Sequence, residues 1–280
     1  MPTDETGGDV CLLTIAVNAD PEWPLLLVAN RDEFHARPTA PVAPWPDLPI
    51  LGGRDLQAGG SWMALGNNNR FALVTNHRDA RRQPPEDAPS RGTLVTEFIL
   101  SQQSAQDFCQ SLTAARAGFN LLLADGKGLW HYSNVNGLCQ PVMPGIHALS
   151  NALLDTPWPK ALRARAALAR AMDNRELSET QLLRLLHDEH RPSDEALPDT
   201  GIRLERERLL SSCFIRSPDY GTRASTLLLQ HRSGRMLFLE EGYDRDGRAL
   251  SLRRYSLDRP LLVPVDWEGV AGSAAPGRDA

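Results

Sequence analysis

The sequence has very little lysine, few cysteines and no long apolar run. Of its 30 basic residues only Lys127 and Lys160 are lysines, and the rest are arginines. The 4 cysteines are widely spaced and form no Cys-x-x-Cys pair, so neither a zinc site nor a disulfide framework is indicated. No stretch approaches the roughly 20 apolar residues that a membrane span requires. At 41% apolar residues, the chain still has enough apolar surface for a substantial core.

Strong charge of either sign is also missing. The formal net charge is -5 and basic and acidic residues are interleaved, which argues against non-specific nucleic-acid binding. No segment resembling a signal peptide opens the chain. We therefore expect a soluble, cytoplasmic protein with free thiols, no resident metal, no nucleic-acid partner and no membrane span.

Apolar periodicity predicts many strands and a few helices. The runs 12–17 and 25–29 are almost continuously apolar, which is typical of strands buried on both faces. Helical spacing predicts a helix over 93–115 with Ser104 capping a second segment, a helix over 159–173, and a helix over 178–188 opened by a Ser178/Gln181 capping box. Hairpin turns are predicted at Asn67–Asn69 and Asp125–Gly128. Further strands are predicted at 60–66, 70–76, 119–125, 128–133, 146–150, 224–231, 235–240 and 250–257.

This order of elements predicts an α+β fold. Doubly wound parallel sheets alternate strand and helix singly, whereas here strands and helices come in groups with prominent hairpins. Strands that are apolar on both faces need cover on both faces. Two mainly antiparallel sheets packed together, each with helices outside, satisfy this need in four αββα layers. We expect a single domain over 11–258 and a loose tail over 259–280.

The residues before Cys11 form a polar, Gly-rich leader that cannot bury a core. The arginine bias is typical of a GC-rich bacterial genome, in which GTG is a frequent start codon and reads as Val when internal. Val10 directly precedes Cys11. We therefore expect either a disordered leader over 1–10 or a true start at Val10, with Cys11 as the first residue after removal of Met.

Cys11 opens the first predicted strand, and Asn30-Arg31-Asp32-Glu33 ends the second. A leading Cys whose own α-amine serves as the base suits nucleophilic catalysis. Adjacent strand residues point to opposite faces, so Arg31 and Asp32 both face Cys11 only if the strand bulges or ends there. Two structural alternatives stand beside this hypothesis: Cys11 is an ordinary buried strand residue, and 30–33 is a turn capped by its own side chains.

Ten short motifs in order along the chain resemble the NRDE-motif family of the transport and Golgi organisation type. They are Cys-Leu-Leu at 11–13, Ala-Asn-Arg-Asp-Glu-Phe at 29–34, Arg37-Pro38, Gly-Gly-Ser-Trp at 59–62, Thr75-Asn76, Arg91-Gly92-x-Leu94-Val95, Gly-Phe-Asn-Leu at 118–121, Leu-Ser-Asn at 149–151, Thr-Pro-Trp-x-Lys at 156–160 and Tyr-Gly-Thr-Arg at 220–223.

The family is itself similar to cysteine N-terminal-nucleophile hydrolases, which have the αββα fold. Carried over residue by residue, the resemblance implies Cys11 as nucleophile, Arg31 as the group that favours thiolate and Asp32 as the group that orients the amine. It also implies Asn76 and Asn151 as oxyanion donors and Arg223 as a distal arginine of the site. The hydrolase families separate the Arg and Asp positions further, so Asn30 and Glu33 are alternatives to Asp32 in its role. Asn30, Glu33 and Trp62 are also candidates for substrate contact.

The resulting hypothesis is a hydrolase or acyltransferase that acts on an amide, thioester or acyl-linked small molecule through Cys11, without a cofactor. The alternative is a non-catalytic carrier or chaperone of haem or an acyl-CoA-type lipid that uses the same pocket, since a fold does not fix function. For a haem carrier, Cys11, His35 or His77 would be an axial ligand.

Overall fold

The computed structural model describes residues 10–82, 87–112, 116–258 and 260–262, with only the backbone at residues 10 and 11. The expected leader and tail therefore lie outside the described residues, apart from the backbone of Val10 and residues 260–262. The elements are β1 (Val10–Val17), β2 (Leu25–Phe34), β3 (Thr39–Pro44), β4 (Leu51–Asp55), β5 (Met63–Leu65), β6 (Arg70–Asn76), α1 (Gly92–Leu100), α2 (Ala105–Ser111), β7 (Phe119–Asp125), β8 (Leu129–Ser133), β9 (Leu138–Pro141), β10 (Gly145–Leu149), α3 (Pro159–Asp173), α4 (Glu179–Arg184), the 3-10 helix η1 (Asp194–Ala196), α5 (Leu204–Leu209), β11 (Tyr220–Gln230), β12 (Arg235–Tyr243) and β13 (Ala249–Asp258).

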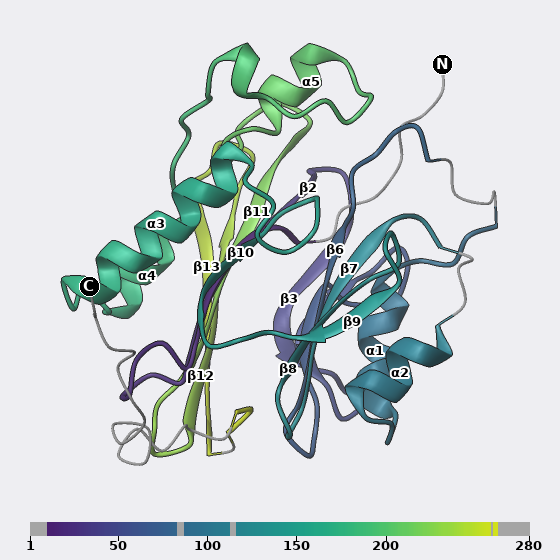
Figure 1. Cartoon of the computed structure of the whole chain (residues 1–280), viewed down its shortest axis with the longest axis vertical. Coiled ribbons are helices and arrows are strands. Elements are labelled where there is room, and N and C mark those ends of the chain that lie inside the picture. Colours follow the sequence, from purple (N-terminus) through teal and green to yellow (C-terminus); the bar gives the residue numbers. More distant parts are fainter. Residues whose placement is uncertain (1–9, 83–86, 113–115, 259, 263–280) are drawn as a thin grey trace, which may run out of the picture.

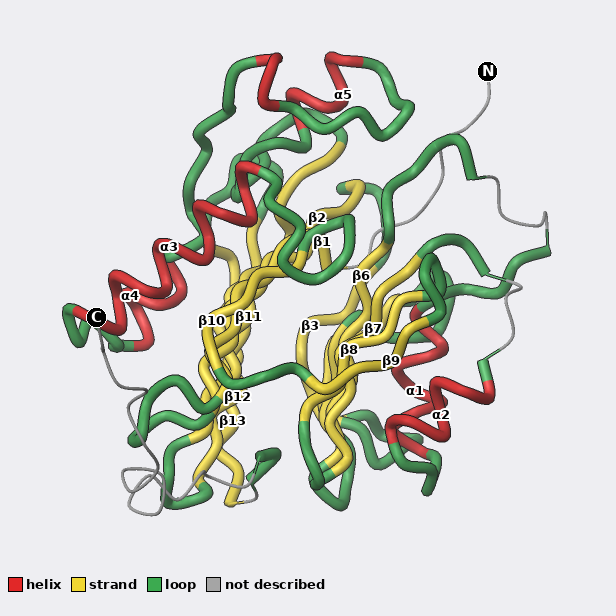
Figure 2. Tube along the Cα trace, viewed as in Figure 1, coloured by secondary structure: helices red, strands yellow, loops and turns green. Residues whose placement is uncertain are grey.

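The strands form two layers with helices on both outer faces (Figures 1 and 2). One layer runs β13-β12-β11-β2-β1 with β10 on the far side of β1, and the other contains β3 to β9. Within the described residues, the two layers share one strand pairing, a single parallel pair between Val10 of β1 and Thr75 of β6. Helices α3 and α4 cover the first layer and α1 and α2 cover the second. The predicted αββα fold of mainly antiparallel sheets is confirmed.

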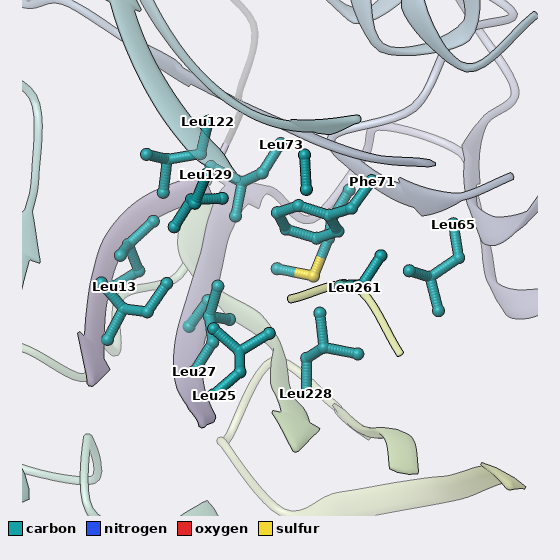
Figure 3. Packing of buried hydrophobic residues seen from close by; sticks show 14 of the residues in the cluster. Leu13, Leu25, Leu27, Leu65, Phe71, Leu73, Leu122, Leu129, Leu228 and Leu261 are labelled. Atoms are coloured by element: carbon teal, nitrogen blue, oxygen red, sulfur yellow. The ribbon is translucent and has the colours of Figure 1, made fainter. Parts of the chain in front are cut away.

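The largest apolar cluster lies between the two sheets. Alternate residues of the first sheet, such as Leu13, Leu27 and Leu228, meet Phe71 and Leu122 of the second (Figure 3). The intervening residues of β1 and β2, such as Leu12 and Val28, pack under α3 and α4 instead. Both faces of β1 and β2 are thus buried, which explains their unbroken apolar sequences.

The predicted helices and hairpins agree with the structure in outline. The stretch 93–115 contains two helices, α1 and α2, with Ser104 accepting the hydrogen bond of the Asp107 N–H as the cap of α2. Ser178 and Gln181 form the expected capping box of α4. The β5–β6 turn uses left-handed backbone at Asn68 and Asn69, with φ of 56° and 58°. None of the helices in the described ranges is long and apolar enough to cross a membrane.

The main difference from the predicted elements lies at 30–33. These residues do not form a turn; β2 continues to Phe34 because β1 and β11 pair with it on both sides. The sequence also does not predict β3, β4, β9 or α5. Pro41 and Pro44 make the sequence of β3 untypical of a strand. Both prolines are tolerated because β3 lies at the edge of its sheet, where a missing N–H donor breaks no strand pairing.

Candidate functional site

The two strands that flank β2 each carry an irregularity at the level of Arg31. On one side Val10 pairs with Arg31 and Leu12 with Asn30, so residue 11 is the extra residue of β1. On the other side Ala224 pairs with Arg31 and Thr222 with Asp32, so residue 223 is the extra residue of β11. Bulges are frequent next to active sites, where they end pairing and redirect the chain. Cys11 and Arg223 thus lie on either side of Arg31, and β2 itself remains regular.

The backbone of residue 11 lies close to a cleft at the ends of these strands. Val10 pairs in parallel with Thr75, and the next residue of β6 is Asn76, which lines the cleft. The cleft has a volume of about 150 Å³. It brings together Asp32, Asn76 and Asn151, which come from three separate parts of the chain. Its further lining residues are His77, Arg78, Asp79, Ala80, Arg82, Arg91, Ala117, Gly118, Lys160, Ile202, Arg206, Leu210 and Tyr220.

The two asparagines of the cleft are hydrogen-bonded to each other. Asn151 Nδ2 donates to Asn76 Oδ1 and, at 3.3 Å, to the Asn76 carbonyl. Asn151 Oδ1 in turn accepts from Lys160 Nζ at 3.5 Å. The Asn76 Nδ2 group donates no hydrogen bond to any residue that the structure describes. Asn151 is therefore placed to orient Asn76, whose amide N–H groups are left as donors in the cleft.

A buried hydrogen-bonded chain holds the turn that carries Asn151. Asn120 Nδ2 donates to Thr75 Oγ1 at 3.0 Å and to the Ala152 carbonyl at 2.9 Å. Thr75 Oγ1 donates to the Ser150 carbonyl at 3.2 Å. His131 Nε2 lies 3.3 Å from Asn120 Oδ1, and burial lowers the pKa of His131 to about 4, so this ring is neutral near pH 7.

Asp32 and Arg31 point to opposite faces of β2, as expected for a regular strand. Asp32 is fully buried and its Oδ1 accepts from Thr222 Oγ1 at 2.6 Å. Arg31 lies between the sheets, where its Cζ is 4.3 Å from the centre of the Trp62 ring and its Nη2 is 3.5 Å from Glu33 Oε2. Arg31 Nε and Nη1 are buried without a hydrogen-bond partner among the described residues. Arg31 therefore lies between the two sheets, whereas Asp32 lies on the opposite face of β2, beside the cleft.

Glu33 and Trp62 belong to the Arg31 side of the sheet. Glu33 is fully buried, and its Oε2 also lies 3.5 Å from Arg37 Nε. Gly53 leaves the space that the Trp62 ring occupies, because a Cβ at residue 53 would lie 2.1 Å from the ring. Neither Glu33 nor Trp62 is among the described residues that line the cleft. Both residues lie beside Arg31, and their contact with a substrate stays a prediction.

Asn30 and Arg223 make structural contacts. Asn30 is fully buried, and its Nδ2 donates to the carbonyls of Leu186 at 3.1 Å and Cys213 at 2.8 Å. Its Oδ1 accepts from Ser225 Oγ at 2.7 Å, so the Asn30 side chain joins β2 to three other segments, and its contact with a substrate stays a prediction. Arg223 Nη1 donates to the Phe34 carbonyl at 3.0 Å and to two further carbonyls of that turn. Burial and the Arg31 charge lower the pKa of Arg223.

Sequence reasoning missed two basic residues of the cleft, Lys160 and Arg78. Lys160 is only 3% exposed, and as one of two lysines among 30 basic residues it could have been singled out from the sequence. The Arg78 N–H donates to the Asn151 carbonyl at 2.8 Å. Its guanidinium lies 4.9 Å from the Trp158 ring and pairs with Glu207 at 3.0 Å. The sequence alone cannot show that the basic segment containing Arg78 borders a cleft.

The histidines named as haem ligands lie in different surroundings. His77 lines the cleft, and burial, with a smaller contribution from Arg82, lowers its pKa. His35 is not among the described lining residues, and its Nε2 lies 3.1 Å from the Ser217 carbonyl. A cleft of about 150 Å³ is below the roughly 300–1,000 Å³ of pockets for drug-sized ligands. Its size and polar lining favour a small polar group over a macrocycle.

Comparison with known proteins places these features in one family. The family model described as Transport and Golgi organisation 2 matches residues 10–245. The Transport and Golgi organization protein 2 homolog of Bos taurus is 34% identical over 238 residues, which cover 77% of this chain and 85% of that protein. Transport and Golgi organization protein 2 of Drosophila melanogaster is 26% identical over 263 residues, covering 83% and 92%. Among solved structures, the Caenorhabditis elegans N-acylethanolamine-hydrolyzing acid amidase ortholog aligns with a TM-score of 0.48 at 11% identity, over 78% of this chain and 92% of that chain.

Proposed function

We propose, from the premise that this chain belongs to the Transport and Golgi organisation 2 family, that it is an N-terminal-nucleophile-type hydrolase or acyltransferase acting through Cys11. Its substrate would be an amide, thioester or other acyl-linked small molecule. The observation that carries the proposal is the irregularity of β1 at residue 11, beside Arg31 and next to the cleft of Asp32, Asn76 and Asn151. A regular core strand needs neither that bulge nor those polar residues.

Activation of the nucleophile requires Cys11 to be the first residue of the mature chain. A free α-amine titrates at about 8 and a thiol at about 8.5, so transfer of the thiol proton to the amine is easy near neutral pH. Positive charge at Arg31, paired with Val10 across the strands, favours thiolate. Asp32, fully buried and held by Thr222 Oγ1, is the carboxylate available to orient the ammonium group.

The reaction then follows two steps. The Cys11 sulfur attacks the acyl carbonyl, and the α-amine takes the thiol proton. Collapse of the tetrahedral intermediate breaks the bond to the leaving amine or thiol, which receives that proton. Water, or another acyl acceptor, then attacks the thioester and gives its proton to the α-amine. The acyl–sulfur bond breaks, the acid or transferred acyl product leaves, and the proton passes to the Cys11 sulfur.

The negative oxygen of each tetrahedral intermediate needs a fixed donor. Asn76 Nδ2 has this role in the proposal, because Asn151 Nδ2 donates to Asn76 Oδ1 and so turns the Asn76 amide nitrogen to the cleft. One such donor contributes roughly 3 kcal/mol to the transition state in comparable sites. Asn151 is then a positioning residue rather than a second donor.

The decisive experiment compares two forms of the protein. One form is cleaved so that it begins at Cys11, and the other keeps residues 1–10. Both are incubated with short N-acyl amides and acyl thioesters, and Cys11 acylation is followed by intact mass. We expect acylation and turnover only in the form that begins at Cys11, with loss in Cys11→Ala and retention in the matched thiol control Cys139→Ala.

Equal reactivity of the two forms, or turnover in Cys11→Ala, would refute the proposal. If neither form is acylated by any of these substrates, the alternative of a non-catalytic carrier of haem or an acyl-CoA-type lipid takes precedence. Intact mass of the protein from its source would show directly whether its chain begins at Cys11.

A further inference from the structure

We infer that His147 and Asp155 form a clamp that holds the turn carrying Asn151 at the cleft, and that this clamp requires a protonated His147. Asn151 binds Asn76, the oxyanion donor of the proposed function, so the effect of the clamp on catalysis rests on that function. The clamp itself depends only on contacts of the turn. His147 and Asp155 act as positioning residues, because neither is among the described residues that line the cleft.

Asp155 closes the turn that carries Asn151. The Asp155 N–H donates to the Ala148 carbonyl at 2.9 Å, and Asp155 Oδ1 accepts from the Ala148 N–H at 2.9 Å. Ala148 belongs to β10, which pairs with β1, and Asp155 has left-handed backbone with a φ of 59°. These two hydrogen bonds tie the ends of the turn together, with Asn151 between them. The place of the Asp155 carboxylate therefore bears on the place of Asn151.

His147 fixes the Asp155 carboxylate. Its Nδ1 lies 2.7 Å from Asp155 Oδ2, and its Nε2 lies 2.8 Å from the Met143 carbonyl. Both partners are acceptors. A neutral imidazole has a single ring N–H and satisfies only one of them, whereas an imidazolium donates to both. The contacts of the ring therefore match the protonated form of His147.

The same contacts set the pH at which the clamp is lost. The hydrogen bond to Asp155 raises the pKa of His147 above its ordinary 6.5; burial opposes the shift and the Met143 carbonyl adds to it. A histidine with a higher pKa in the folded state stabilises the fold fully below about 6.5, and this contribution is lost as pH rises through the folded pKa. The clamp is therefore closed in mildly acidic solution and opens as the pH rises.

Two other ionisable groups near the clamp do not change charge in this range. Arg165 of α3 lies 3.9 Å from Asp155 Oδ1 and stays charged, and its charge slightly disfavours the proton on His147. His131 of β8 feels the Asp155 charge, but burial lowers the pKa of His131 to about 4. On the β1 side His147 pairs with Ile15, which carries no charge. A change of the turn near neutral pH therefore reports His147.

The first measurement does not depend on turnover. It uses the form that keeps residues 1–10, which has no free amine at Cys11. The His147 ring and the Asn151 side-chain amide are followed by NMR on isotope-labelled protein between about pH 5 and about pH 9. We expect His147 to titrate with a midpoint above its ordinary 6.5, and the Asn151 amide resonances to shift with the same midpoint.

Variants separate the clamp from a general effect of pH. His147→Gln keeps a donor for Asp155 but has no titrating charge, so the Asn151 amide should lose this pH dependence. His190→Gln is the matched control, because His190 is exposed, and it should keep the dependence. Asp155→Asn should lower the His147 midpoint, which gives a second test if His147→Gln fails to fold.

The second measurement concerns catalysis. In the form that begins at Cys11, kcat and KM for a short N-acyl amide are compared with those of His147→Gln at each pH. The α-amine and the thiol titrate in the same range, and their contributions cancel in the ratio of the two proteins. We expect the kcat ratio to fall about threefold to tenfold as pH rises through the His147 midpoint, with KM nearly unchanged.

A His147 midpoint at or below 6.5, or an Asn151 shift that keeps its pH dependence in His147→Gln, would overturn the inference. Failure of the proposed function looks different: Asn151 would still follow His147, yet the form that begins at Cys11 would hydrolyse no N-acyl amide. Turnover with a kcat ratio that is constant over pH would instead leave the hydrolase standing and reject the role of the clamp.

Discussion

Replacement of Asn30 by Ala tests whether this residue of the Asn30-Arg31-Asp32-Glu33 segment stabilises the fold or binds substrate. Asn30 is fully buried on the helix side of β2 and joins three parts of the chain. Its Nδ2 binds the carbonyls of Leu186 and Cys213, and its Oδ1 binds Ser225 Oγ. Asn30→Ala removes all three hydrogen bonds and leaves these partners buried.

The expected cost follows from these contacts. Each hydrogen bond contributes about 1 kcal/mol net, and each buried partner left unsatisfied adds a desolvation penalty of about 1–3 kcal/mol before relaxation. We expect a loss of about 3–5 kcal/mol in the free energy of unfolding, against a typical total of about 5–15 kcal/mol. For a chain of this size the melting temperature should fall by roughly 10 °C.

Urea unfolding followed by circular dichroism measures this loss through the midpoint and slope. Asn174→Ala is the control, because Asn174 is exposed after α3 and caps that helix only through its backbone N–H. It should change the free energy of unfolding by about 0.5 kcal/mol or less. If Asn30→Ala is as stable as this control but loses activity, the structural reading is wrong and Asn30 contacts the substrate.

Three further predictions concern the cleft, the core and the thiols. Asn76→Ala should slow acyl transfer by the chain that begins at Cys11 by about 100-fold while leaving its unfolding curve nearly unchanged; an unchanged rate would remove Asn76 as the oxyanion donor. Burial raises the pKa of Glu240 to about 7 in the folded state, from an ordinary 4.5. Between these two pH values the folded protein holds a proton on Glu240 that the unfolded chain has lost. The free energy of unfolding therefore falls as pH rises from about 4.5 to 7. The stability gained in Glu240→Gln should therefore be larger at pH 8 than at pH 5 in urea unfolding, and an equal gain at both would contradict this. With limiting iodoacetamide and peptide mass spectrometry, Cys11 with a free amine should react first and half-buried Cys139 next. A hydrogen bond from Cys109 lowers the pKa of Cys139. The same hydrogen bond and burial raise the pKa of Cys109, and burial raises the pKa of Cys213 to about 12. Earlier labelling of Cys109 or Cys213 would count against that order.

The sequence by itself determined the layers of the fold and the chemical types at the site. Unbroken apolar runs such as 12–17 required cover on both faces, and the grouping of strands and helices favoured a double sheet between helices over a single parallel sheet. Local signals also fixed the capping box at Ser178 and the hairpin at Asn67–Asn69, because these depend on residues a few positions apart. Short edge strands such as β3 escaped prediction because their prolines and single buried face leave little periodic signal.

Only the tertiary structure decided which of the polar residues share a site. Strand period alone puts Arg31 and Asp32 on opposite faces, but which face borders a cleft depends on what packs against each one. The bulges at residues 11 and 223 arise from register with β2, and register between strands far apart in sequence has no local signature. The same holds for Lys160 and Arg78, which meet at Asn151 only because α3 and the segment after β6 converge there. The sequence therefore gives the residue types of the site, whereas long-range packing decides which of those residues lie together in the cleft.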